Sequence, residues 1–180
     1  GYSLFVPEEY TPDRAWPLVI ALHDAGGRGE EFIQAWVGEA KRRGVIVFCP
    51  TYEEPRGEAP FDHDKRLLRL KQEIQNQYEI DAARVLIAGS GTGGHYAFYL
   101  GLKYPKEFSA VASIGNAVRG TLERWFTYSY AEVNQLPVLI LVDRAQDEPV
   151  SDGTQSELEE IKSRGYAIQT VKTDDSSLLH

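Results

Sequence analysis

The segment RVLIAGSGTGGHYAFYLGLKYPKEF, residues 84–108, decides the fold, because it runs from a strand through a glycine-rich turn into a helix. Arg84 to Ala88 form a short apolar run that predicts a buried strand. Residues 92–104 predict the next helix, which stops before Pro105. Two kinds of site use so small a turn: a phosphate cradle at a helix N-terminus, and a G-x-S-x-G turn that holds a serine above a sheet.

The phosphate interpretation fits the segment less well. A P-loop needs Lys followed by Ser or Thr after its glycines, whereas Gly94-His95 stands there. Gly89, Gly91 and Gly94 do satisfy the spacing of a dinucleotide fingerprint, so this alternative stays open on the local pattern alone. It is weakened by context, because the motif follows the third core strand and no acid ends the next strand near Ile114.

Short apolar runs alternate with amphipathic stretches along the whole chain. This alternation predicts a three-layer α/β domain, with a mostly parallel central sheet and helices on both faces. Ligands of such sheets bind at the carboxyl ends of the strands. We expect one domain over 1–180, with strands at 2–6, 17–23, 45–49, 84–88, 109–114, 136–142 and 166–171, and helices at 30–43, 63–79, 92–104 and 152–164.

Composition excludes several classes of protein. The formal charge of −8 argues against a nucleic-acid-binding surface. No apolar run approaches the roughly 20 residues of a membrane span, so we expect a soluble protein of unassigned compartment and oligomeric state.

One Cys and 4 His are poor material for a metal site, so no metal or cofactor is expected. Cys49 lies in an apolar run and is interpreted as a buried hydrophobic residue. The chain does not begin with Met, which leaves a processed or excised segment open.

Four segments together resemble the α/β-hydrolase superfamily, and within it the small serine esterases of the poly-hydroxybutyrate depolymerase, feruloyl esterase and phospholipase/carboxylesterase type. YSLFVPEEYTPDRAWPLVIALHDAGG (2–27) resembles their N-terminal strand and the His-Gly-x-Gly-Gly oxyanion turn. The double glycine followed by YLGLKYP (99–105) resembles their elbow helix. LPVLILVDRAQDEPV (136–150) and SRGYAIQTVKTDDSSLLH (163–180) resemble the segments that present the triad acid and histidine.

The resemblance implies a carboxylic-ester hydrolase with a Ser-acid-His triad, and it breaks at the nucleophile. Its register assigns the acid to Asp147 and the base to His180, and it places Gly91 where the serine belongs. A glycine has no side chain that could form an acyl-enzyme. The sequence therefore predicts an impaired enzyme or a homologue that binds a small ester or carboxylate ligand, and it leaves open whether this glycine is natural.

The oxyanion turn also departs from the family pattern, because Asp24 replaces a glycine. The backbone N–H of Asp24 or Ala25 could form an oxyanion hole together with that of Thr92. A carboxylate beside such a hole would repel a developing oxyanion, which is a second argument against efficient ester hydrolysis. We expect His23 to hold this loop through hydrogen bonds.

Two other functions remain. Ser90 could be the nucleophile of an active esterase if the turn slipped by one residue, although Thr92 would then be a bulky flanking residue. The chain could also be an interaction or scaffold domain that kept the fold without the pocket.

Overall fold

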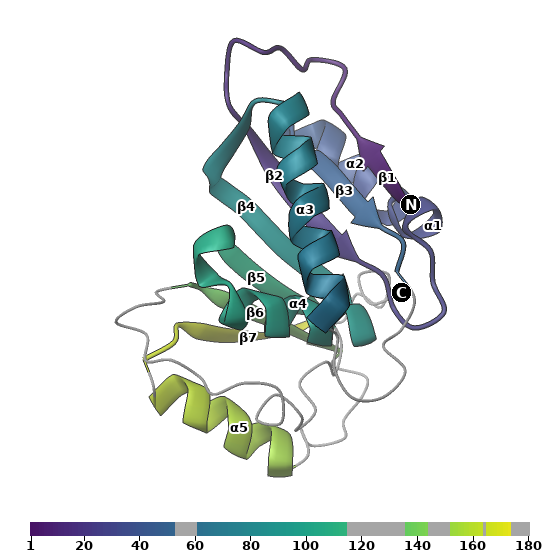
Figure 1. The fold of residues 1–180 in the computed structure, drawn as a ribbon. Coiled ribbons are helices and arrows are strands. Elements are labelled where there is room, and N and C mark those ends of the chain that lie inside the picture. Colours follow the sequence, from purple (N-terminus) through teal and green to yellow (C-terminus); the bar gives the residue numbers. More distant parts are fainter. Residues whose placement is uncertain (53–60, 115–135, 144–151, 164, 174–180) are drawn as a thin grey trace.

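A computed structural model describes residues 1–52, 61–114, 136–143, 152–163 and 165–173 (Figure 1). Its centre is a seven-stranded sheet with the strand order β1-β3-β2-β4-β5-β6-β7. The strands are β1 (Tyr2–Phe5), β2 (Trp16–Leu22), β3 (Ile46–Pro50), β4 (Ile80–Ser90), β5 (Ala110–Ile114), β6 (Val138–Asp143) and β7 (Ile168–Thr173). The helices are α1 (Gly29–Phe32), α2 (Gln34–Arg43), α3 (Phe61–Gln77), α4 (Thr92–Lys103), the 3-10 turn η1 (Pro105–Glu107) and α5 (Asp152–Ser163).

The sheet is mostly parallel, as the sequence predicts. β1 runs antiparallel to β3, and every other neighbouring pair of these strands is parallel. Buried residues of α3, α4 and α5 join the larger core on one face of the sheet, while α1 and α2 cover the other face. The expected three-layer arrangement is therefore confirmed.

Two elements differ from the expectations. The helix expected over 30–43 is divided into α1 and α2 at Ile33, although Gly44 ends it in the left-handed conformation at φ 63° as expected. β4 begins at Ile80, before the predicted apolar run. Ile80 pairs in register with Trp16, whose N–H donates to the carbonyl of Glu79, the residue before β4, at 2.7 Å. No continuous apolar run marks this part of the strand.

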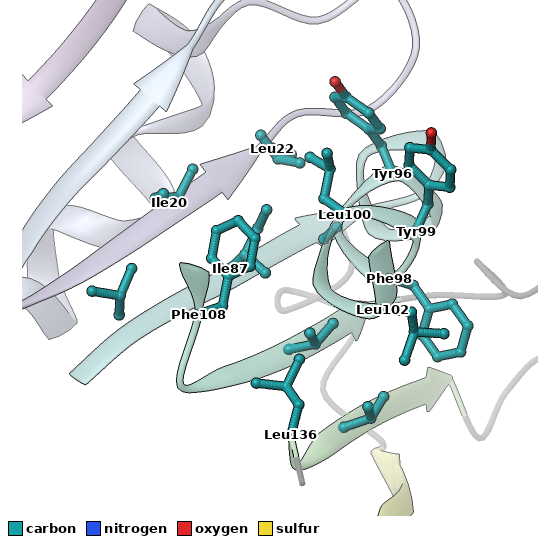
Figure 2. Packing of buried hydrophobic residues seen from close by; sticks show 14 of the residues in the cluster. Ile20, Leu22, Ile87, Tyr96, Phe98, Tyr99, Leu100, Leu102, Phe108 and Leu136 are labelled. Carbon is teal, nitrogen blue, oxygen red and sulfur yellow. The ribbon is translucent and has the colours of Figure 1, made fainter. Parts of the chain in front are cut away.

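The larger core joins α4 to the sheet. Figure 2 shows Leu100 of α4 beside Leu22 of β2, and both side chains are fully buried. Tyr96 and Tyr99 project from α4 as a stacked pair with their ring centroids 6.2 Å apart. This packing holds α4 against the sheet.

The strand register brings two loops together at that edge of the sheet. Leu22 of β2 pairs with Gly89 of β4, so the residues that follow these strands, 23–25 and 90–92, are neighbours. None of the helices in the described part of the chain combines the length and apolar character that crossing a bilayer requires.

Candidate functional site

Gly91 joins the end of β4 to the first turn of α4. Its backbone has φ 54° and ψ −122°, in the left-handed range that side chains rarely adopt. The N–H of Gly91 donates to the carbonyl of Ile114 at 3.0 Å, and its carbonyl accepts from the N–H of His95 at 3.1 Å. The turn is therefore tied to both β5 and α4, and glycine satisfies its backbone without strain.

The glycines on either side of this turn have no room for a side chain. A Cβ at Gly89 would lie closer than 3.0 Å to the backbone of Gly93. A Cβ at Gly93 would lie equally close to the carbonyls of Leu22 and His23. The sequence Gly-x-Gly-x-Gly thus allows the start of α4 to approach the ends of β4 and β2 very closely.

The carboxylate of Asp24 is bound at the N-terminus of α4. Its Oδ1 accepts the backbone N–H of Thr92 at 2.8 Å, the hydroxyl of Thr92 at 3.0 Å and the backbone N–H of Ala25 at 2.7 Å. Gly91 itself supplies no side-chain cap for the helix, so Asp24 caps it from the loop after β2. The positive end of the helix dipole favours a carboxylate at this position.

These contacts also set the charge of Asp24. Partial burial raises the pKa of the carboxyl group, but the hydrogen bonds from Thr92 and Ala25 and the nearby His23 outweigh that effect and lower the pKa overall. Asp24 is thus a carboxylate at neutral pH, with little basicity.

His23 holds the loop, as the sequence predicts. Its side chain is buried, its Nδ1 lies 2.8 Å from the carbonyl oxygen of Asp24, and its Nε2 accepts the backbone N–H of Tyr52 at 3.4 Å. The ring of Tyr52 stacks on the imidazole at 4.2 Å, and its hydroxyl donates to the carbonyl of His23 at 2.5 Å. Tyr52 was not singled out from the sequence, because it is 29 residues away.

A pocket of about 360 Å³ opens beside these loops. Ser90 lies at its wall as the last residue of β4, paired in register with Ile114 and only 5% exposed. Because Ser90 belongs to the extended strand, the sharp turn is at Gly91. The lining residues are His23, Asp24, Gly27, Arg28, Glu31, Phe32, Ala35 and Ser90.

The structure brings together five of the residues singled out from the sequence. Ser90 lines the pocket and precedes Gly91 in the turn, and the backbone donors of Ala25 and Thr92 converge on Asp24. The two remaining residues, Asp147 and His180, lie outside the described residues. The sequence does not predict that the Asp24 carboxylate accepts both N–H groups, because this depends on the orientation of its side chain.

Residues 1–136 match the model of the Esterase family, described as "Putative esterase". A curated relative, Probable feruloyl esterase C of Aspergillus niger, is 23% identical over 125 residues, which is 65% of this chain and 46% of the relative. The chain thus spans about half the length of that relative.

Solved structures share the fold at low identity. The serine hydrolase FphF of Staphylococcus aureus superposes with a TM-score of 0.72 at 13% identity, covering 95% of this chain and 83% of that one. A ferulic acid esterase of Anaeromyces mucronatus, solved with ferulic acid, gives a TM-score of 0.67 at 14% identity over 95% of this chain and 76% of the other. The chain belongs to the Esterase family and has the α/β-hydrolase fold.

Proposed function

We propose that this chain is a non-hydrolytic member of the Esterase family, which lacks the nucleophile at Gly91 and binds a small ester in its pocket. The observation that carries the proposal is the backbone of Gly91, at φ 54° and ψ −122° between β4 and α4. A nucleophile elbow is a sharp, strained turn at this point of the fold. The close approach at Gly89 and Gly93 supports the same register.

The missing side chain removes the acyl-enzyme route. Formation of an acyl-enzyme requires an oxygen or sulfur nucleophile within reach of the ester carbonyl. Position 91 offers neither, and Asp147 and His180, which would serve as acid and base, have no hydroxyl to activate there. The backbone N–H groups of Ala25 and Thr92, which donate to Asp24 in this structure, would then have no oxyanion to stabilise.

A neutral ester fits the pocket better than a free acid. Two acidic residues, Asp24 and Glu31, outnumber the one basic residue, Arg28, in the pocket lining and disfavour a further anion, whereas Phe32 and Ala35 provide apolar surface. Relatives named for ferulic acid make an aromatic ester the first ligand to try. Methyl ferulate should therefore shift the protein's NMR resonances more strongly than ferulate at the same concentration, with the largest shifts around residues 23–35.

Ser90 supports one competing function, that of an active hydrolase, because it lines the same pocket as His23. A fluorophosphonate probe distinguishes the two. We expect no covalent adduct on the protein by intact mass, and no turnover of short-chain p-nitrophenyl esters above that of an S90A variant. An adduct on Ser90, lost in S90A, would establish the active hydrolase instead. Absence of both labelling and ester binding would favour a scaffold domain.

A further inference from the structure

The two backbone donors at the strand ends point at one oxygen atom. The N–H groups of Ala25 and Thr92 lie 2.7 and 2.8 Å from Oδ1 of Asp24, although they come from different loops. These are the distances at which an oxyanion hole holds a developing negative oxygen. The atom that receives them is a permanent part of this chain, and its charge resembles that of the oxyanion.

The same carboxylate fills the space next to Gly91. A Cβ at position 91 would lie closer than 3.0 Å to Cγ, Oδ1 and Oδ2 of Asp24. The carboxylate is the end of a rotatable side chain, so the overlap can be relieved by turning it out of the loop. That rotation would break its hydrogen bonds to Ala25 and Thr92.

We propose that Asp24 is an intramolecular occupant of the oxyanion hole, and that the hole accepts either the Asp24 carboxylate or a side chain at position 91, but not both. This inference rests on the proposed function only in assigning the purpose of the two donors. Restoring a nucleophile at position 91 would therefore displace Asp24 and uncap α4. The absence of a side chain at position 91 and the position of the Asp24 carboxylate are linked by their shared space.

A double-mutant cycle tests the exclusion without relying on catalysis. G91A adds only the Cβ, and D24A removes the three atoms that this Cβ would meet. The cost of placing alanine at φ 54° is present in both backgrounds, so it cancels in the cycle. We expect G91A to raise the unfolding equilibrium constant about threefold more in the wild-type background than in D24A, measured by urea denaturation at pH 7, because relieving the overlap costs only the hydrogen bonds of the Asp24 carboxylate.

Gly44 provides the matched control. Its φ of 63° is similar, but a Cβ there would meet only a ring carbon of Trp16 at 3.4 Å. G44A should therefore cost the same in the wild-type and D24A backgrounds. Equal costs for G91A in the two backgrounds would overturn the exclusion, and the absence of fluorophosphonate labelling would still support the proposed function. An adduct on Ser90, combined with a larger cost of G91A in the wild type than in D24A, would refute the proposed function and support the exclusion.

A second measurement covers the case in which variants at position 91 do not fold. In the wild-type protein, the amide protons of Ala25 and Thr92 should shift together as the Asp24 carboxyl group titrates, followed by NMR. D24A should abolish both shifts. Amide shifts that are independent of the Asp24 carboxyl group would show that the hole is not occupied, and would overturn the proposal.

Discussion

Asp24 and Gly91 share one space at the edge of the sheet: the carboxylate of Asp24 lies where a side chain at position 91 would have to lie. The two residues are far apart in sequence and meet because β2 and β4 are parallel neighbours in register. In this position the Asp24 carboxylate caps α4, so we expect it to affect the free energy of unfolding as well as ligand binding.

The first prediction concerns pH. The hydrogen bonds to Asp24 hold its folded-state pKa below the ordinary value of 3.8, so its stabilising effect is complete above that value. The effect is lost as the pH falls through the lowered folded-state pKa. The difference in unfolding free energy between wild type and D24A should be below about 1 kcal/mol at pH 7, because Asp24 is exposed, and should shrink by pH 2. Urea denaturation at both pH values measures it; a difference that grows on acidification would contradict the assignment.

Sequence patterns predict the sheet well, because apolar runs such as 17–23 and 45–49 have to be buried on both faces. They fail at the start of β4, where polar contacts such as those of Asp81 with Ala83 and Arg84 accompany the strand and no continuous apolar run marks it. The resemblance to the esterases also predicts that the loop of Asp24 lies near Thr92. It does not predict that the Asp24 carboxylate enters the space beside Gly91, since this depends on a side-chain rotation and on how the two loops meet.

The second prediction concerns the close approach of β4 and α4. In G89A the new Cβ would overlap the backbone of Gly93, which cannot rotate away as a side chain can. We expect a loss of about 2 kcal/mol or more of unfolding free energy, measured by urea denaturation.

Gly38 is the control for G89A, because it lies in α2 and a Cβ there has no atom within 4 Å. G38A should stabilise the protein by about 0.5–1 kcal/mol through better helix propensity. Similar small effects for both variants would show that the first turn of α4 is not tightly packed against β4.

The third prediction concerns a buried carboxylate that joins α3 to α4. Asp64 is fully buried and accepts bonds from Tyr96 at 2.9 Å and Lys103 at 2.7 Å. D64A would leave the Lys103 ammonium, whose side chain is only 20% exposed, without its carboxylate. Removing one partner of such a pair should cost about 3 kcal/mol of unfolding free energy.

An exposed ion pair provides the comparison for D64A. Glu39 pairs with Arg43 on α2 at 3.0 Å, and the side chains are 48% and 75% exposed. E39A should therefore cost less than about 0.5 kcal/mol. If D64A cost no more than E39A in the same urea titration, the Asp64 network would have no role in holding α4 in place.

The last prediction uses the single thiol. Cys49 lies in β3 with no exposed surface, and burial raises its pKa to about 12. Because the thiolate is the reactive form, a disulfide reagent at pH 8 should not modify the folded protein on the timescale on which it modifies a free thiol. Urea should accelerate modification in parallel with unfolding, and the destabilised D64A variant should react earlier in the titration than wild type. Rapid modification of Cys49 in native buffer would contradict this packing of β3, since the reagent can reach the sulfur only if α1 and α2 separate from the sheet.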